Sequence, residues 1–266
     1  MRTALRSTSN GSRGMRELLR LLRCEWIKLK HAKFLFVGLS GTLIVPFFVI
    51  VKAVIQSFSH TGGTVSLFTL YDNALMFLML LFAPMVLTIL DAWIISREYT
   101  DGTLKNILAV PVSKTAFLWG KLLFCAIAAL SFMLISWLEI FVLALLCGCF
   151  IPVTELTIPS LLYFLLKMLF GGGLLCATQL PFIYFTIRSK GFVLPLVAVS
   201  AISLINVVLS NSPIAGFYPW SAAYLLVTGR LAGQACPKGV SLLIILAVCL
   251  LGIAASLVRW KREEIR

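Results

Sequence analysis

The sequence has few charged side chains and few of the residues that carry out chemistry. Charged residues make up 12% of the 266 positions, only 10 are acidic, and the two histidines, His31 and His60, lie far apart. The chain contains no G-x-x-x-x-G-K-[ST] phosphate loop, no G-x-S-x-G nucleophile turn and no H-E-x-x-H pair. Its seven cysteines include no C-x-x-C pair. We therefore expect no catalytic residue, no metal site and no cofactor in this chain, and these absences exclude ATP binding by a phosphate loop.

Apolar residues, by contrast, dominate the chain. They make up 60% of it, with a mean hydropathy of +1.01, against roughly 45–50% in soluble domains. A run of about 18 apolar residues is long enough to cross a bilayer core. The sequence therefore predicts an all-α integral membrane protein with one transmembrane domain, residues 34–258. The six predicted spans are Phe34–Ile55, Ala74–Ser96, Thr115–Phe150, Ile158–Ile187, Phe192–Leu209 and Val240–Val258.

Two predicted spans have unusual features. Thr115–Phe150 would be about 54 Å long at ~1.5 Å per residue, so it must tilt, protrude or break. Ile158–Ile187 carries Gly171–Gly173, Gln179 and Pro181, from which we expect a kink or a locally irregular stretch. The glycine run lacks a following lysine, which favours helix packing or a hinge over a phosphate cradle. Before the second span, Asp72 and Asn73 are expected to introduce the helix.

The distribution of the cations predicts topology. The net charge is +13, but the cations flank apolar runs and form no aromatic-interleaved basic face, which argues against nucleic-acid binding. Of the 23 lysines and arginines, 19 fall on one side of the six predicted spans and two on the other. By the positive-inside rule, both termini should be cytoplasmic. The membrane in which we expect the protein is the plasma membrane. The 19 cations lie in residues 1–33, Arg97–Lys121, residues 188–190 and the basic tail, residues 259–266.

The N-terminal region divides into two parts. Residues 1–14 are polar and without periodicity, and are expected to be disordered or to precede a functional start at Met15. Residues 15–33 alternate apolar and basic positions with helical spacing, which predicts an amphipathic helix in the membrane interface. Its apolar face holds Met15, Leu18, Leu22, Trp26 and Leu29, and its polar face holds Arg16, Arg20, Arg23 and Lys28.

A polar stretch, Arg97–Lys121, separates the second and third spans. Asp101–Gly102 is a helix stop, and Thr103 can cap a new short helix. Leu104, Ile107 and Leu108 then fall on one face of that helix, before Pro111 ends it. The pattern predicts a small amphipathic helix held crosswise at the membrane surface, where it can serve as a docking surface.

Ionisable residues inside the spans are further candidates, since each costs about 2.5–3.5 kcal/mol at mid-membrane. Asp91 is near the cytoplasmic end of the second span, within reach of Arg97 or water. Glu139 and Lys167 lie at similar depth in the third and fourth spans and could form an ion pair. Such a pair would fix helix register or belong to a substrate or proton pathway. In the predicted outer segments, one disulfide is possible among Cys147, Cys149 and Cys236.

Two segments resemble type-2 ATP-binding-cassette (ABC) exporter permeases, especially the branch associated with lantibiotic immunity and bacitracin resistance. They are Glu25–Lys30, reading E-W-I-K-L-K, and Glu98–Asn106, reading E-Y-T-D-G-T-L-K-N, followed by Pro111–Lys114. The resemblance implies a coupling helix between spans two and three that contacts an ATPase subunit. The implied coupling residues are Arg97, Glu98, Asp101, Gly102, Thr103, Leu104, Lys105, Asn106, Ile107 and Leu108.

The resemblance also implies partners. These are an ABC ATPase that binds ATP and magnesium, a second permease, identical or related, membrane lipid, and an amphiphilic substrate such as an antimicrobial peptide. An exporter of sodium ions, drugs or lipid is an alternative within the class. A proton-coupled secondary transporter using Asp91, Glu139 and Lys167 is an alternative outside it, although paired broken helices are not evident in the sequence.

Overall fold

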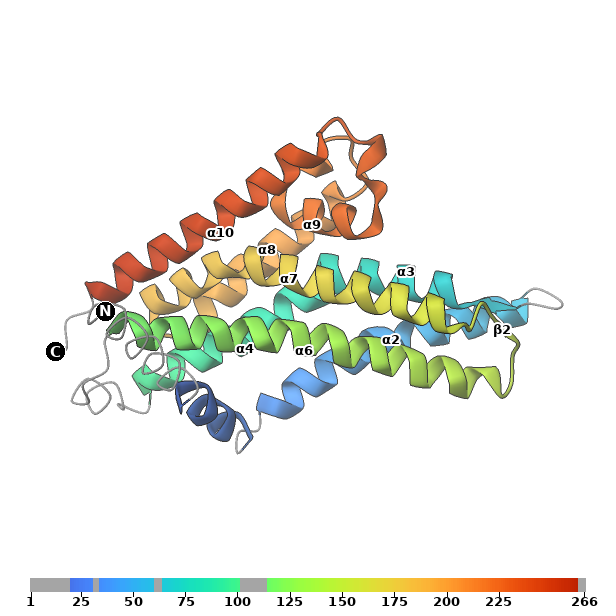
Figure 1. The fold of residues 1–266 in the computed structure, drawn as a ribbon, viewed down its shortest axis with the longest axis horizontal. Helices are drawn as coiled ribbons and strands as arrows, with labels where there is room; N and C mark the ends of the chain where they lie inside the picture. The colour runs from blue at the N-terminus through green and yellow to red at the C-terminus, as the bar shows by residue number, and fades with distance from the viewer. Residues whose placement is uncertain (1–19, 31–33, 60–63, 101–113, 263–266) are drawn as a thin grey trace, which may run out of the picture.

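The computed structural model describes residues 20–30, 34–59, 64–100 and 114–262. Within these ranges the elements are helices, apart from one pair of two-residue strands, and turns and short loops join them (Figure 1). A helix over residues 20–30, here called the N-terminal helix, precedes the labelled elements. These are α2 (Phe34–Ser59), β1 (Val65–Ser66), α3 (Leu67–Phe77), η1 (Leu78–Phe82), α4 (Ala83–Thr100), α6 (Lys114–Gly148), β2 (Val153–Thr154), α7 (Ile158–Ser189), α8 (Val193–Leu209), η2 (Ala215–Phe217), α9 (Pro219–Thr228), η3 (Arg230–Gly233) and α10 (Lys238–Lys261).

Five helical stretches are long and apolar enough to cross a membrane. They are Gly38–Phe58, Leu67–Thr100, Thr115–Gly148, Ile158–Ser189 and Lys238–Lys261. The predicted fifth span corresponds to α8, which is apolar but has only 17 residues, or about 26 Å at 1.5 Å per residue. The structure therefore has the architecture of an all-α membrane protein, and a full crossing by α8 stays a prediction. The segment between α8 and α10 contains the short helix α9.

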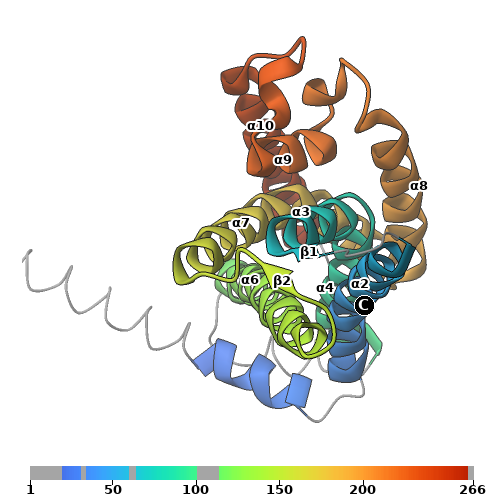
Figure 2. The same ribbon diagram turned by 90° about the vertical axis from the view of Figure 1, so that its right-hand side faces the viewer.

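The helix ends gather at the two ends of the bundle. The N-terminal helix, the end of α4, the start of α6 and the end of α10 lie at one end, and β1 and β2 lie at the other (Figure 1). Seen along the bundle, α7 and α3 occupy the middle, α6 and α2 lie on one side of them, and α9 and α10 lie on the other (Figure 2). The long helix α7 packs against both α6 and α10, and it is thus the central element of the bundle.

The second span begins earlier than the sequence predicted. The helix starts at Leu67, so Asp72 lies inside α3 and does not introduce the span. Apolar residues on both sides of Asp72 are buried against the bundle, and this packing outweighs the local preference of Asp and Asn for helix starts. The second span also contains an irregular stretch, the π-helix η1. Asn206 of α8 donates a hydrogen bond to the Leu80 carbonyl within η1, at 3.0 Å.

The locally irregular stretch predicted in the fourth span is not formed, whereas the alternative, a kink, stays a prediction. The helix α7 runs without interruption from Ile158 to Ser189, with Pro181 inside it. Its glycines instead allow close packing. A Cβ at Gly171 would lie 3.2 Å from the Met79 sulfur, and one at Gly172 would lie 3.3 Å from Leu130. The third span is likewise a single unbroken helix, the 35-residue α6. Both helices are long enough to extend beyond a bilayer core of about 30 Å.

The crossing of α7 and α10 brings the backbones of two spans into close contact. A Cβ added at Gly252 would lie 2.8 Å from the backbone nitrogen of Pro181 and 2.9 Å from the carbonyl carbon of Leu180. Backbone atoms cannot move aside as a flexible side chain can, so only glycine fits here. By contrast, a Cβ at Gly173 of α7 would meet no atom within 4 Å. This pattern is typical of small residues at helix interfaces in membranes.

Candidate coupling site

Four charged side chains from three helices form a buried cluster at the end of the bundle where α4 ends. The N-terminal helix supplies Glu25 and Lys28, α4 supplies Glu98, and α6 supplies Lys121. One oxygen of Glu98 lies 2.7 Å from the Lys28 ammonium and 3.1 Å from the Lys121 ammonium. One oxygen of Glu25 lies 3.3 Å from the Lys121 ammonium and 3.4 Å from that of Lys28. We call these four residues the ion cluster.

The ion cluster is almost closed to solvent. The exposed fractions of the Glu98 and Lys121 side chains are 1% each, that of Glu25 is 7%, and that of Lys28 is 31%. With two carboxylates and two ammonium groups, the cluster has no net charge. Lys121 also donates to the carbonyl of Ile94, at 2.5 Å. Its ammonium group therefore has two hydrogen-bond acceptors, the Ile94 carbonyl and Glu98, and an ion-pair contact with Glu25, as expected for a buried charge.

The protonation of Lys28 reflects this environment. Burial alone would lower the pKa of Lys28, but its hydrogen bond to Glu98 and the charges of Glu25 and Glu98 outweigh burial, so the pKa is raised above 10.5. Lys28 is therefore an ammonium ion at neutral pH. The two carboxylates that stabilise it belong to different helices, so the charge of Lys28 links the N-terminal helix to α4.

Further contacts surround the ion cluster. Arg97 of α4 donates to the carbonyl of Lys28, at 3.3 Å, and its guanidinium lies 5.1 Å from the ring centre of Trp93. Trp260 of α10 packs against Tyr99 of α4, with ring centres 6.2 Å apart, and is stacked on Phe117 of α6, at 6.0 Å. The N-terminal helix, α4, α6 and α10 are thus joined at one end of the bundle.

Of the predicted coupling residues, only two lie in the described part of the chain. Arg97 and Glu98 are in the last turns of α4, and the other eight fall within residues 101–113, which are not described. Glu98 is buried and bound to Lys28 and Lys121. Its predicted role in coupling therefore stays a prediction, in which the buried carboxylate acts through the helices that it joins.

The N-terminal helix packs against the bundle with part of its predicted apolar face and with one residue of its predicted polar face. Leu22 and Leu29 contact the apolar cluster beside the ion cluster, as expected for the predicted apolar face, whereas Leu18 lies outside the described residues. Trp26 is 58% exposed. Lys28, predicted on the polar face, turns inward to Glu98. The position of this helix in the membrane interface stays a prediction.

The predicted ion pair between Glu139 and Lys167 is not formed. Glu139 accepts a hydrogen bond from Thr42 of α2, at 3.0 Å, and its other carboxylate oxygen is buried without a partner. Lys167 pairs with Asp72 of α3, at 3.4 Å. The prediction rested on the similar depth of Glu139 and Lys167 in neighbouring spans. Depth along a helix does not determine the direction in which a side chain points.

Asp91 lies in a different environment from the predicted one. It is 5% exposed, it lies beside the thiol of Cys125, and one of its carboxylate oxygens has no partner. The suggested contact with Arg97 is not formed, because Arg97 turns toward the N-terminal helix. Nearby, Thr88 donates to Gln179 of α7, at 2.7 Å, which joins the second and fourth spans.

All seven cysteines are free, so the disulfide suggested for the outer segments is not present. Sequence reasoning also missed Glu25 and Lys121 as members of the ion cluster. The available signals were the i, i+3 spacing of Glu25 and Lys28 and the position of Lys121 in an otherwise apolar helix. Neither signal indicates which helix packs against these charged residues.

The fold is that of a multi-pass helical membrane protein, in which buried charges tie a helix outside the long spans to the ends of two of them. Comparison with known families specifies this further. The chain belongs to the ABC-2 family transporter proteins, whose family model matches residues 21–210. The matched part contains the whole ion cluster and extends to the end of α8.

The sequence is also similar to that of a known permease. Over 195 residues the chain is 27% identical to the bacitracin transport permease protein BCRB of Bacillus licheniformis, a match that covers 73% of this chain and 91% of that protein. The resemblance seen in the two sequence segments is therefore confirmed, and the chain is a permease-type transport component similar to a bacitracin permease.

Proposed function

We propose that this chain is the membrane-spanning permease subunit of an ABC exporter, working with a separate ATPase subunit that binds and hydrolyses ATP with magnesium. Membership of the ABC-2 family supports this proposal. The structural observation that carries it is the ion cluster. It fastens the N-terminal helix to α4 only three residues before Asp101, where the predicted coupling segment begins.

In this proposal the ion cluster transmits force. The ATPase subunit contacts residues 101–108 on the cytoplasmic side, and closure of the ATPase pair pushes on this segment and on the N-terminal helix. Glu98 is bound to Lys28 on one side and to Lys121 on the other, so a displacement of the N-terminal helix reaches α4 and α6 together. Packed elements respond to such a push by moving between discrete arrangements. The spans would thereby change from an inward to an outward arrangement, with a second permease, identical or related, completing the path.

We further propose that the exported substrate is an amphiphilic antimicrobial peptide of the bacitracin or lantibiotic type. The name of the Bacillus licheniformis relative supports this choice. The cytoplasmic position of both termini is supported by the bias of 19 cations to two across the predicted spans. Export of sodium ions, drugs or lipid is the alternative within the family.

The test is purification of the tagged chain from its native membrane in mild detergent, followed by reconstitution. We expect an ABC ATPase to copurify and the complex to show ATP hydrolysis stimulated by bacitracin or a lantibiotic. Cells lacking the chain should become more sensitive to the same peptide. Peptide-independent hydrolysis with unchanged sensitivity would reject the substrate class, and a chain that transports without any ATPase would reject the whole proposal.

The coupling role is tested in the reconstituted complex by replacing Glu98→Gln. We expect hydrolysis to continue while peptide transport falls, because the N-terminal helix is released from α4. Glu155→Gln is a matched control at the opposite end of the bundle, where Glu155 accepts from Ser66 in an exposed position. Equal transport-to-hydrolysis ratios in the two variants would remove the coupling assignment.

A further inference from the structure

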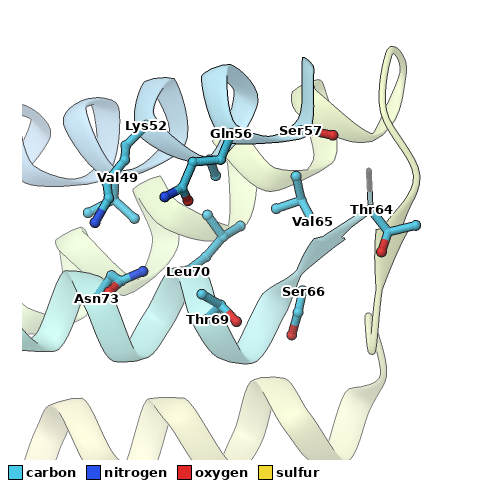
Figure 3. Close-up of a pocket in the computed structure, with 11 residues that line it drawn as sticks. Val49, Lys52, Gln56, Ser57, Thr64, Val65, Ser66, Thr69, Leu70 and Asn73 are labelled. Carbon is cyan, nitrogen blue, oxygen red and sulfur yellow. The ribbon is translucent and has the colours of Figure 1, made fainter. Parts of the chain in front are cut away.

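A small polar pocket lies at the end of the bundle opposite the ion cluster. It has a volume of about 190 Å³ and is enclosed by α2, the strand β1 and the first turns of α3 (Figure 3). Lys52 and Gln56 reach into it from α2, and Asn73 reaches into it from α3 (Figure 3). The three side chains therefore converge on one space from two helices that are adjacent in the chain.

Among the described residues that line this pocket, Lys52 carries the one charge and none is acidic, while the amides and hydroxyls can each donate or accept a hydrogen bond. An ammonium group has only donors, and an amide can turn its NH₂ toward a ligand. Within the described residues, Lys52, Gln56 and Asn73 make no side-chain hydrogen bond or ion pair to the protein. The pocket thus gathers one positive charge and two amides whose donors are all available.

Two acids at this end of the bundle contact residues other than Lys52. Asp72, next to Asn73 in the chain, pairs with Lys167 of α7. Glu155 accepts a hydrogen bond from the hydroxyl of Ser66, at 2.5 Å, and is not part of the pocket lining. A half-buried ammonium group without a counter-charge costs free energy, and an anionic ligand would remove that cost.

The surface beside the pocket is suited to an apolar chain. Phe48 and Ile55, one turn before and one turn after Lys52 on α2, are 53% and 61% exposed, and both belong to a stretch long and apolar enough to cross a membrane. Lys52 is six residues from the end of the span at Phe58, or about 9 Å along a helix. This is within the distance over which a lysine reaches the headgroup region.

We propose that this pocket binds a phosphate group, with Lys52 as the charged anchor and Gln56 and Asn73 as hydrogen-bond donors. The source of the phosphate is either a lipid headgroup, whose chains would lie along Phe48 and Ile55, or free inorganic phosphate. A phosphate offers several acceptor oxygens in a tetrahedral arrangement, which matches donors that arrive from different helices. The proposal concerns binding alone and stands whether or not the chain exports peptides.

The test uses the full-length protein in detergent, with binding measured by native mass spectrometry and by thermal shift. Three probes are compared: dioctanoyl phosphatidic acid, dioctanoylglycerol, which has the same chains without phosphate, and inorganic phosphate. We expect phosphatidic acid to bind and dioctanoylglycerol not to bind. Binding of inorganic phosphate with the same dependence on Lys52 would assign the site to the free ion, and phosphatidic acid alone would assign it to a lipid.

Variants locate the binding in the pocket. Lys52→Met should weaken binding by about tenfold or more, as expected from the loss of a charge-assisted hydrogen bond, and Lys52→Arg should retain most of it. Lys167→Met is the matched control, because Lys167 is a cation on a neighbouring helix that is paired with Asp72 and lies outside the pocket. Equal binding by the Lys52→Met and Lys167→Met proteins, or binding of dioctanoylglycerol as tight as that of phosphatidic acid, would overturn the proposal.

Discussion

Replacing Glu98→Gln tests how strongly the ion cluster holds the N-terminal helix to the bundle. The substitution keeps the size of the side chain but removes one of two buried negative charges, so Lys121, which is 1% exposed, is left between Glu25 and a neutral amide. Removing one partner of a buried ion pair typically costs about 3–5 kcal/mol. We therefore expect the free energy of unfolding to fall by about this amount.

The assay is reversible unfolding in mixed micelles, followed by tryptophan fluorescence. The control is Asp72→Asn, because Asp72 pairs with Lys167 but its side chain is 38% exposed, and exposed pairs contribute about 0–1 kcal/mol. Combining Glu98→Gln with Lys121→Met should cost less than the sum of the single losses, since the second change removes the uncompensated charge. The reasoning fails if Glu98→Gln costs no more than Asp72→Asn, or if the double variant is strictly additive.

Three further predictions follow from other contacts. Glu139→Gln and Lys167→Met should have additive effects on the free energy of unfolding in a double-mutant cycle, because the two residues have different partners; a coupling above about 0.5 kcal/mol would contradict this. The stabilisation from Lys28 should be complete below pH 10.5 and should disappear as the pH rises through its higher folded-state pKa, so the difference in melting temperature between wild type and Lys28→Met should shrink only in that alkaline range. Gly252→Ala should destabilise the protein by about 1–3 kcal/mol, because the added Cβ would clash with the backbone of α7. Gly173→Ala is the control and should be neutral or stabilising, since a Cβ there meets no atom within 4 Å. Equal melting temperatures for these two variants would contradict the close α7–α10 crossing.

Hydrophobic runs predicted most of the helices of this fold. A run of apolar residues indicates a helix in a membrane, because only a helix satisfies its own backbone there. The ends of the helices were harder to predict, since a polar residue such as Asp72 is tolerated inside a helix when an oppositely charged residue such as Lys167 is near. The π-helix η1 had no sequence signal at all, because it depends on the packing of the second span against α8, where Asn206 donates to Leu80.

The candidate site was predictable only in part. The sequence indicated Glu98 by resemblance and Lys28 by helical periodicity, but it placed Lys28 on a solvent face. Periodicity averages over a whole helix, and a single buried ion pair can reverse the direction of one side chain. The other two members of the ion cluster, Glu25 and Lys121, are 73 and 23 residues away from Glu98 along the chain and lie on other helices. Only the three-dimensional packing brings these charges together.

The ion cluster is a costly way to join helices, and this cost distinguishes a structural role from a coupling role. Replacing a buried, paired set of charges by apolar residues of similar volume is often neutral or stabilising by about 1–4 kcal/mol. A variant with Glu25, Lys28, Glu98 and Lys121 all changed to Met or Leu should therefore fold and insert with a melting temperature near or above that of the wild type.

If the cluster served only to hold the N-terminal helix, this variant would transport normally. If the charges must separate and re-form as α4 and α6 move, the variant should hydrolyse ATP but transport little, because apolar packing offers no directional contact that links the two arrangements. Full transport by the stable apolar variant would therefore refute the coupling role, even if the single Glu98→Gln change destabilises the protein as expected.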